Sequence, residues 1–195
     1  MREYGCPAGI NVTASHNPKE YNGYKVYWSD GAQLPPQHAA AIARELETID
    51  IFTGVTSMDF DEAVQKGLIT MLGADCDERF MANVMSMVND YETVKKVAGD
   101  FKLVYTPFHG CGYKLVPEAL RGLGIRHLYP VEEQMVIDGN FPTVQSPNPE
   151  NGEALTMAIA VADRENADLV LATDPDADRG GLAGRDDKGK MAVLN

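Results

Sequence analysis

The chain of 195 residues contains little cysteine, little basic charge and no long apolar run. Its three cysteines, Cys6, Cys76 and Cys111, are widely spaced, so the sequence predicts neither a disulfide framework nor a zinc site of the CxxC type. The first residues do not contain the apolar segment of a secretory signal, and we therefore expect a cytoplasmic protein. The longest mostly apolar stretch, residues 154–162, is far shorter than the roughly 20 residues of a membrane-spanning helix.

Acidic residues outnumber basic ones: the chain has 29 aspartates and glutamates but only 17 lysines and arginines, which gives a formal net charge of −12. Nucleic acids and anionic membranes are bound through basic surfaces, so we expect neither as a partner. The acidity is compatible with a site for a cation. With 44% hydrophobic and 24% charged residues, the composition is that of an ordinary globular protein.

Two strand patterns and two helix patterns occupy the first half of the chain. The two strands are predicted over residues 8–14 and 24–28, and the two helices over residues 35–49 and 75–89. Asn22-Gly23 and Asp30-Gly31 bound the second strand as turns.

From residue 102 the sequence alternates strand and helix patterns. The predicted order is strand, helix, strand, helix, strand, over residues 102–106, 113–123, 125–129, 152–165 and 168–172. This order predicts the α/β fold class with a parallel sheet, and the last strand has the pattern of a fully buried one. A hairpin is predicted over residues 180–193. The composition changes near residue 70, so we predict two units, residues 1–70 and 71–195.

Three carboxylates, Asp174, Asp176 and Asp178, follow directly after the last predicted strand. Their spacing lets alternate side chains converge, and bunched carboxylates repel each other unless a cation neutralises them. Oxygen ligands favour Mg²⁺, Ca²⁺ or Mn²⁺ over zinc. An EF-hand is excluded because Arg179 and Arg185 stand where that loop needs glycine and glutamate. A solvated acidic turn is the alternative, although ligands do bind at the carboxyl ends of strands in α/β sheets.

A second polar motif, Thr13 to Pro18, also lies at the end of a predicted strand. Ser15 at such a corner would be accessible, as a nucleophile or phosphate carrier must be. Ser15 and His16 are neighbours, and neighbours on an extended chain point apart, so the sequence alone does not make them a catalytic pair. A polar turn is the interpretation that the residues alone favour. Lys25, in the next strand, is either a solvated charge or an acid/base group.

The segment Phe108-His109-Gly110-Cys111-Gly112 lies between a predicted strand and a predicted helix. Its two glycines lack the full fingerprint of a phosphate-binding loop. A tight structural turn is therefore the favoured interpretation.

Two of these motifs together resemble the α-D-phosphohexomutase family. They are Thr13-Ala14-Ser15-His16-Asn17-Pro18, followed by Tyr21-Asn22-Gly23-Tyr24-Lys25, and Asp174-Pro175-Asp176-Ala177-Asp178-Arg179. Asp138-Gly139-Asn140-Phe141-Pro142 and Ser146-Pro147-Asn148-Pro149-Glu150 are similar to the bacterial phosphoglucomutase branch of that family. The resemblance covers essentially the whole chain. It implies mixed or parallel sheets in three α/β/α layers.

The resemblance implies a nucleophile and a metal site. Ser15 would be the phosphoserine that gives its phosphoryl group to the sugar and takes one back. Asp174, Asp176 and Asp178 would hold Mg²⁺, with a phosphoserine oxygen of Ser15 as a further ligand.

The resemblance also implies three further catalytic residues near the transferred group. Arg179 would bind the phosphoserine or a substrate phosphate, and acid or base roles would fall to His16 and Lys25. These residue types suit the reaction, because phosphoryl transfer depends on charge neutralisation and in-line positioning.

The family has four domains, and the resemblance places residues 1–70 at the end of the first and residues 71–195 in the second. The whole enzyme would bind a sugar phosphate and interconvert glucose 1-phosphate and glucose 6-phosphate through a sugar bisphosphate. We expect this chain alone to be inactive, because the loops that read the sugar and clamp its distal phosphate belong to the other two domains. A phosphomannomutase or phosphopentomutase, or an inactive metal-binding fragment, are the alternatives. The oligomeric state stays open.

Overall fold

The computed structural model describes residues 1–194, and their contacts divide the chain into two compact units. The first consists of Met1–Val12 and Tyr24–Cys76, and the second of Thr13–Gly23 with the chain from Asp77 onward. The loop of residues 13–23 therefore belongs by its contacts to the second unit. The domain division expected at residue 70 stays a prediction.

The first unit contains a two-stranded sheet and short helices. The sheet pairs β1 (Ala8–Thr13) with β2 (Gly23–Trp28), where the sequence predicts strands. The helices are η1 (Arg2–Tyr4), α1 (Pro36–Leu46) and α2 (Phe60–Gln65). α1 begins at a proline, as predicted, and ends before residue 49. α2 was not predicted from the sequence, and Asp59 caps it by accepting a hydrogen bond from the Glu62 N–H at 3.1 Å.

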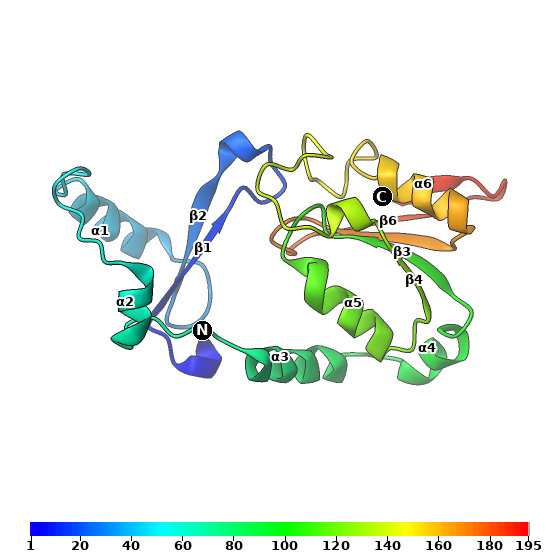
Figure 1. The fold of residues 1–195 in the computed structure, drawn as a ribbon, viewed down its shortest axis with the longest axis horizontal. Coiled ribbons are helices and arrows are strands. Elements are labelled where there is room, and N and C mark those ends of the chain that lie inside the picture. The colour runs from blue at the N-terminus through cyan, green and yellow to red at the C-terminus, as the bar shows by residue number, and fades with distance from the viewer. Residues whose placement is uncertain (195) are drawn as a thin grey trace. The chain divides into compact units, whose positions relative to one another are not determined.

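A five-stranded sheet forms the centre of the second unit, in the order β4-β3-β5-β6-β7 (Figure 1). Three strands are parallel: β3 (Lys102–Thr106), β4 (His127–Pro130) and β5 (Leu169–Thr173). The hairpin of β6 (Gly180–Arg185) and β7 (Met191–Leu194) continues the sheet in antiparallel fashion. The predicted α/β class is confirmed, with a mixed sheet.

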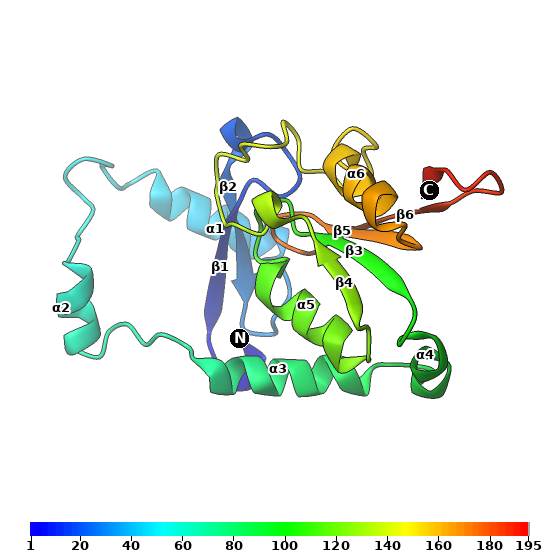
Figure 2. The same ribbon diagram turned by 45° about the vertical axis from the view of Figure 1, so that its right-hand side comes forward.

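Helices cover both faces of this sheet, which gives the second unit three layers (Figures 1 and 2). α6 (Thr156–Glu165) lies on one face. The other face carries α5 (Gly112–Gly122), with α3 (Ala74–Ser86) and α4 (Tyr91–Val97) on the same side. Two short 3₁₀ turns, η2 (Lys19–Tyr21) and η3 (Glu132–Gln134), lie in loops. No helix of the described chain is long and apolar enough to cross a membrane.

The side chains of β5 alternate between two apolar cores. Val170 and Ala172 are fully buried in the core that also contains Leu155, next to α6. Leu169 and Leu171 face the second core and are only partly buried. The expectation of a fully buried strand was therefore wrong for this face, because α5 packs mainly on the neighbouring β4.

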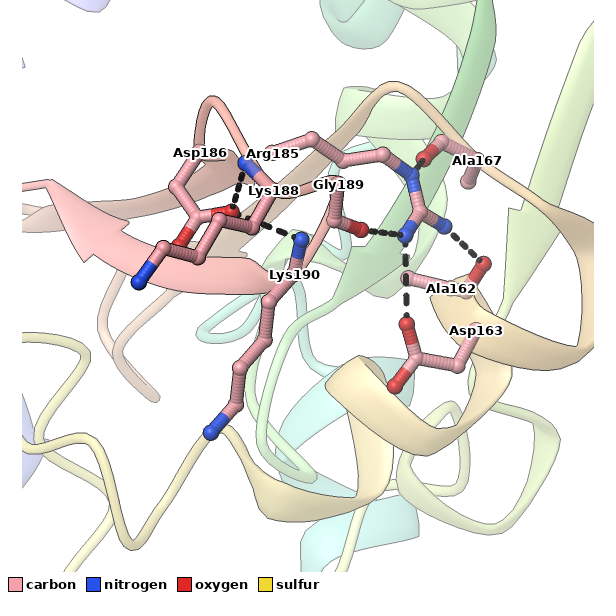
Figure 3. Close-up of polar contacts among 8 residues, drawn as sticks. All are labelled: Ala162, Asp163, Ala167, Arg185, Asp186, Lys188, Gly189 and Lys190. Atoms are coloured by element: carbon pink, nitrogen blue, oxygen red, sulfur yellow. Dashed lines mark hydrogen bonds and ion pairs between the residues drawn. The ribbon is translucent and has the colours of Figure 1, made fainter.

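Arg185, at the end of β6, ties the hairpin to the C-terminal end of α6 (Figure 3). Its Nε donates to the Ala167 carbonyl at 2.8 Å, and its Nη2 donates to the Ala162 carbonyl at 3.0 Å. Nη1 donates to the Gly189 carbonyl at 2.7 Å and to the Asp163 carboxylate at 3.3 Å. One guanidinium thus joins the turn of the hairpin to the C-terminal end of α6 and to the residues just after it.

We expect Arg185→Ala to lower the free energy of unfolding by about 2–3 kcal/mol, because several hydrogen bonds from one charged donor are lost together. Urea unfolding measures the change. The matched control is Arg164→Ala on α6. Arg164 is exposed and pairs with Glu165 at 2.9 Å, so its loss should cost less than about 1 kcal/mol. Equal losses in both variants would contradict the role given to Arg185.

Candidate functional site

The acidic loop, residues 174–179, connects β5 to β6 and brings its three carboxylates together. One oxygen each of Asp174, Asp176 and Asp178 lies within 4.8 Å of the others. The loop closes on itself, because the Ala177 N–H donates to the Asp174 carbonyl at 2.9 Å and the Arg179 N–H donates to Asp174 Oδ1 at 2.9 Å. Ala177 adopts a positive φ of 57°, which turns the chain back. Alternate carboxylates therefore converge at the carboxyl end of β5.

Asp174 is the buried member of this cluster. Its Oδ2 is buried and accepts no hydrogen bond. Burial, and then contact with the Asp176 carboxyl and the charges of Asp176 and Asp178, raise the pKa of Asp174 to about 7. A buried carboxylate oxygen without a donor is costly, and a divalent cation would satisfy it. The all-oxygen donor set fits Mg²⁺ or Mn²⁺.

The segment of residues 108–112 packs directly behind the acidic loop. The Cys111 N–H donates to the Pro175 carbonyl at 2.8 Å. A Cβ added to Gly110 would lie 2.2 Å from Pro175 Cα, so only glycine allows the two backbones to approach this closely. Phe108 and His109 take positive φ values of 47° and 65°. The predicted tight turn is therefore also the support of the acidic loop, which sequence reasoning missed.

A buried polar network fixes this segment in turn. His109 is buried, its Nδ1 lies 2.9 Å from the Val136 carbonyl oxygen, and its Nε2 lies 2.8 Å from Thr143 Oγ1. Gln134 donates from Nε2 to Thr143 Oγ1 at 3.0 Å and accepts from Thr106 Oγ1 at 2.6 Å. The partners are far apart in sequence and lack a local motif, so nothing in the sequence indicated this network.

The serine loop, residues 13–18, holds Ser15 in a strained conformation. Ser15 has a φ of 53°, which is uncommon for a residue with a side chain and which costs of order 1–3 kcal/mol. The Ser15 N–H donates to Thr13 Oγ1 at 2.8 Å, and the Asn17 N–H donates to the Ala14 carbonyl at 3.1 Å. Ser15 Oγ lies 3.3 Å from His16 Nδ1. The two neighbouring side chains thus meet because the backbone at Ser15 is not extended.

The two cationic candidates are placed differently. Arg179 follows the acidic loop, and its Nη1 lies 3.4 Å from Glu150 Oε1. Lys25 lies on β2 in the first unit, where it is half-buried. The structure therefore brings Ser15 together with His16, and it clusters the three aspartates. Both groups lie within the second unit. The role of Lys25 stays a prediction.

Comparisons with known proteins match both parts of the chain. Residues 1–51 match the family model described as phosphoglucomutase/phosphomannomutase, alpha/beta/alpha domain I, and residues 78–189 match domain II of the same family. A phosphoglucomutase of Staphylococcus aureus (strain MRSA252) is 36% identical over 198 residues, which cover 100% of this chain and 34% of that protein. The chain thus spans about a third of the length of the curated relatives it matches.

Solved structures agree with this match. A phosphoglucomutase/phosphomannomutase family protein from Burkholderia thailandensis has a TM-score of 0.54 and 26% identity, and the match covers 94% of this chain and 34% of that one. A protein of Thermus thermophilus has a TM-score of 0.65 and 24% identity to this chain. The match covers 93% of this chain and 37% of that one, and it shows the fold alone. With the family model for domain II covering more than half of its residues, the chain belongs to the phosphoglucomutase/phosphomannomutase family.

Proposed function

We propose that this chain is part of a Mg²⁺-dependent phosphoglucomutase that interconverts glucose 1-phosphate and glucose 6-phosphate in the cytoplasm. The observation that carries the proposal is the placement, in one unit, of a strained Ser15 loop and a cluster of three carboxylates. The 36% identity to a staphylococcal phosphoglucomutase favours glucose phosphates as substrates.

In this proposal Ser15 Oγ carries the phosphoryl group. When a sugar hydroxyl attacks, the bond between phosphorus and Ser15 Oγ breaks, a new bond to the sugar oxygen forms, and the hydroxyl proton passes to a base. The reverse transfer, from the other end of the sugar bisphosphate, restores phosphoserine. His16 is placed to accept or donate a proton at Ser15 Oγ, since its Nδ1 lies 3.3 Å away. Lys25 is the second acid/base candidate.

The acidic loop supplies the metal ligands in this proposal. Asp174, Asp176 and Asp178 would hold Mg²⁺, with an oxygen of the Ser15 phosphate as a further ligand. Bound there, Mg²⁺ would neutralise charge on the transferring phosphoryl group. Arg179 would exchange its contact with Glu150 for a phosphate oxygen, because an ion pair with an exposed glutamate at 3.4 Å is weak.

A phosphomannomutase is the second candidate, since the matching family description names both sugars. The ratio of kcat/KM for glucose 1-phosphate to that for mannose 1-phosphate separates the two. Absence of turnover with every hexose or pentose phosphate, in the full product of the gene, would favour an inactive metal-binding protein.

We expect Ser15 to be the residue that takes up phosphate, because its hydroxyl lies on the strained loop beside His16 Nδ1. The full gene product is incubated with glucose 1,6-bisphosphate and Mg²⁺, and its peptides are mapped by mass spectrometry. Phosphate should appear on the Ser15 peptide and be lost in Ser15→Ala, together with turnover. Ser86→Ala is the control, since that hydroxyl only donates to the Asn83 carbonyl within α3. Phosphate on another residue, or turnover by Ser15→Ala, would refute the proposal.

A further inference from the structure

The segment Ser146–Glu150 contacts the serine loop with its first residue and the acidic loop with its last residue. At its start, Ser146 Oγ donates to the His16 carbonyl at 3.0 Å, although 130 positions separate the two residues. At its other end, Glu150 Oε1 lies 3.4 Å from Arg179 Nη1, directly after the acidic loop. We call this segment the strap.

The middle of the strap is rigid and buried. Pro147 and Pro149 are fully buried. A Cβ added to Gly181, the second residue of β6, would lie 2.2 Å from the Pro149 carbonyl oxygen, so the strap lies against the strand that leaves the acidic loop. Asn148 closes a turn by accepting the Glu150 N–H on Oδ1 at 3.0 Å. The strap is thus fixed to the acidic side of the unit, and Ser146 projects from a fixed base.

The strap donates its hydrogen bond to the serine loop directly next to the strained residue Ser15. The His16 carbonyl belongs to the residue that follows Ser15, whose φ of 53° persists only where its surroundings hold it. Ser146 is half-buried, so this hydrogen bond is partly shielded from water. The contacts that place residues 13–23 with the second unit include this one.

We propose that Ser146 is a positioning residue, which holds the Ser15 backbone in its strained conformation and at a fixed place relative to the acidic loop. Its effect on the backbone is independent of any reaction. Its effect on phosphoryl transfer rests on the proposed function, because misplacing a nucleophile by about 1 Å can cost about 100-fold in rate.

The test uses the pair Ser146→Thr and Ser146→Val in the full gene product, because the two side chains have nearly the same shape and only threonine keeps the hydroxyl. Hydrogen–deuterium exchange reports the amides of residues 14–17, including the Asn17 N–H that bonds the Ala14 carbonyl. We expect exchange to be about tenfold faster in Ser146→Val than in Ser146→Thr. Ser86→Ala again serves as the control, since it too removes a hydroxyl that donates to a backbone carbonyl.

Kinetics provide the second readout. Ser146→Val should lower kcat about 10- to 100-fold. KM for the sugar phosphate, and the affinity of the dephosphorylated protein for Mn²⁺, should each change by less than about threefold, because the acidic loop is held by other contacts. Ser146→Thr should restore most of kcat. A merely structural role would lower metal affinity together with kcat.

Equal exchange and equal kcat in Ser146→Thr, Ser146→Val and Ser86→Ala would overturn the proposal. If Ser146→Val does not fold, Ser146→Ala removes the hydroxyl without adding volume, and exchange in that variant equal to Ser86→Ala would overturn it as well. Failure of the proposed function gives a different result. In that case either the unmodified protein has no turnover or Ser15→Ala keeps its turnover, while the exchange measurement still decides the role of Ser146.

Discussion

Replacing Asp176 with asparagine is expected to lower the affinity for Mg²⁺ or Mn²⁺ by about 100-fold, equivalent to about 2.7 kcal/mol, and to lower turnover at least as much. Asp176 contributes one of the three oxygens that lie within 4.8 Å of each other, and affinity for hard cations depends on the charge and number of such ligands. Calorimetric titration with Mn²⁺ measures the affinity. The matched control is Asp187→Asn, an exposed aspartate in the turn between β6 and β7.

The same substitution should have the opposite effect on stability when metal is absent. Burial raises the pKa of Asp174 most, and the hydrogen bond with Asp176 and then the repulsion by its charge raise it further. Removing one negative charge relieves this repulsion, so Asp176→Asn should unfold at a higher temperature than the unmodified chain in EDTA. In Mg²⁺ the order should reverse. Unchanged affinity, or a less stable metal-free variant, would contradict the metal site.

Gly110→Ala is expected to destabilise the chain by about 3 kcal/mol or more, the upper range for overpacking a buried contact. Its Cβ would lie 2.2 Å from Pro175 Cα and 2.4 Å from the Pro175 carbonyl oxygen, and backbone atoms cannot move away as a flexible side chain can. Because Pro175 stands between Asp174 and Asp176, displacing it should also weaken Mn²⁺ binding.

Urea unfolding and Mn²⁺ titration of Gly110→Ala measure the two effects. Gly139→Ala is the matched control, since nothing lies within 4 Å of a Cβ at that position. If both variants were equally stable and bound Mn²⁺ equally, the support that residues 108–112 give to the acidic loop would be refuted.

The elements of the second unit could be predicted because their signals are local. β3 and β5 are short apolar runs, and α5 ends at Gly122, close before Gly124 with its φ of 93°. α6 begins at Thr156, four residues after the predicted start, because tight turns occupy the residues before it. The hairpin of β6 and β7 could be predicted from the turn-rich residues between the two strands.

The candidate site was predictable only in part, for the same physical reason. The spacing of Asp174, Asp176 and Asp178 is local, so their convergence could be expected from the sequence. The positive φ of Ser15 and the bond from Ser146 to the His16 carbonyl depend on residues far away in the chain. Periodicity and propensity carry no information about such pairs. The resemblance to a family indicates the site residues, but not the contacts that hold them in place.

The bond between Ser146 and His16 also sets an order of events during synthesis. The ribosome adds about 5–20 residues per second, so residue 146 is made roughly 7–26 seconds after residue 16. β1 and β2 are complete long before then, but the loop between them lacks its partner until the strap has emerged. The serine loop therefore reaches its final conformation only after residue 146 has been made, 130 positions after His16.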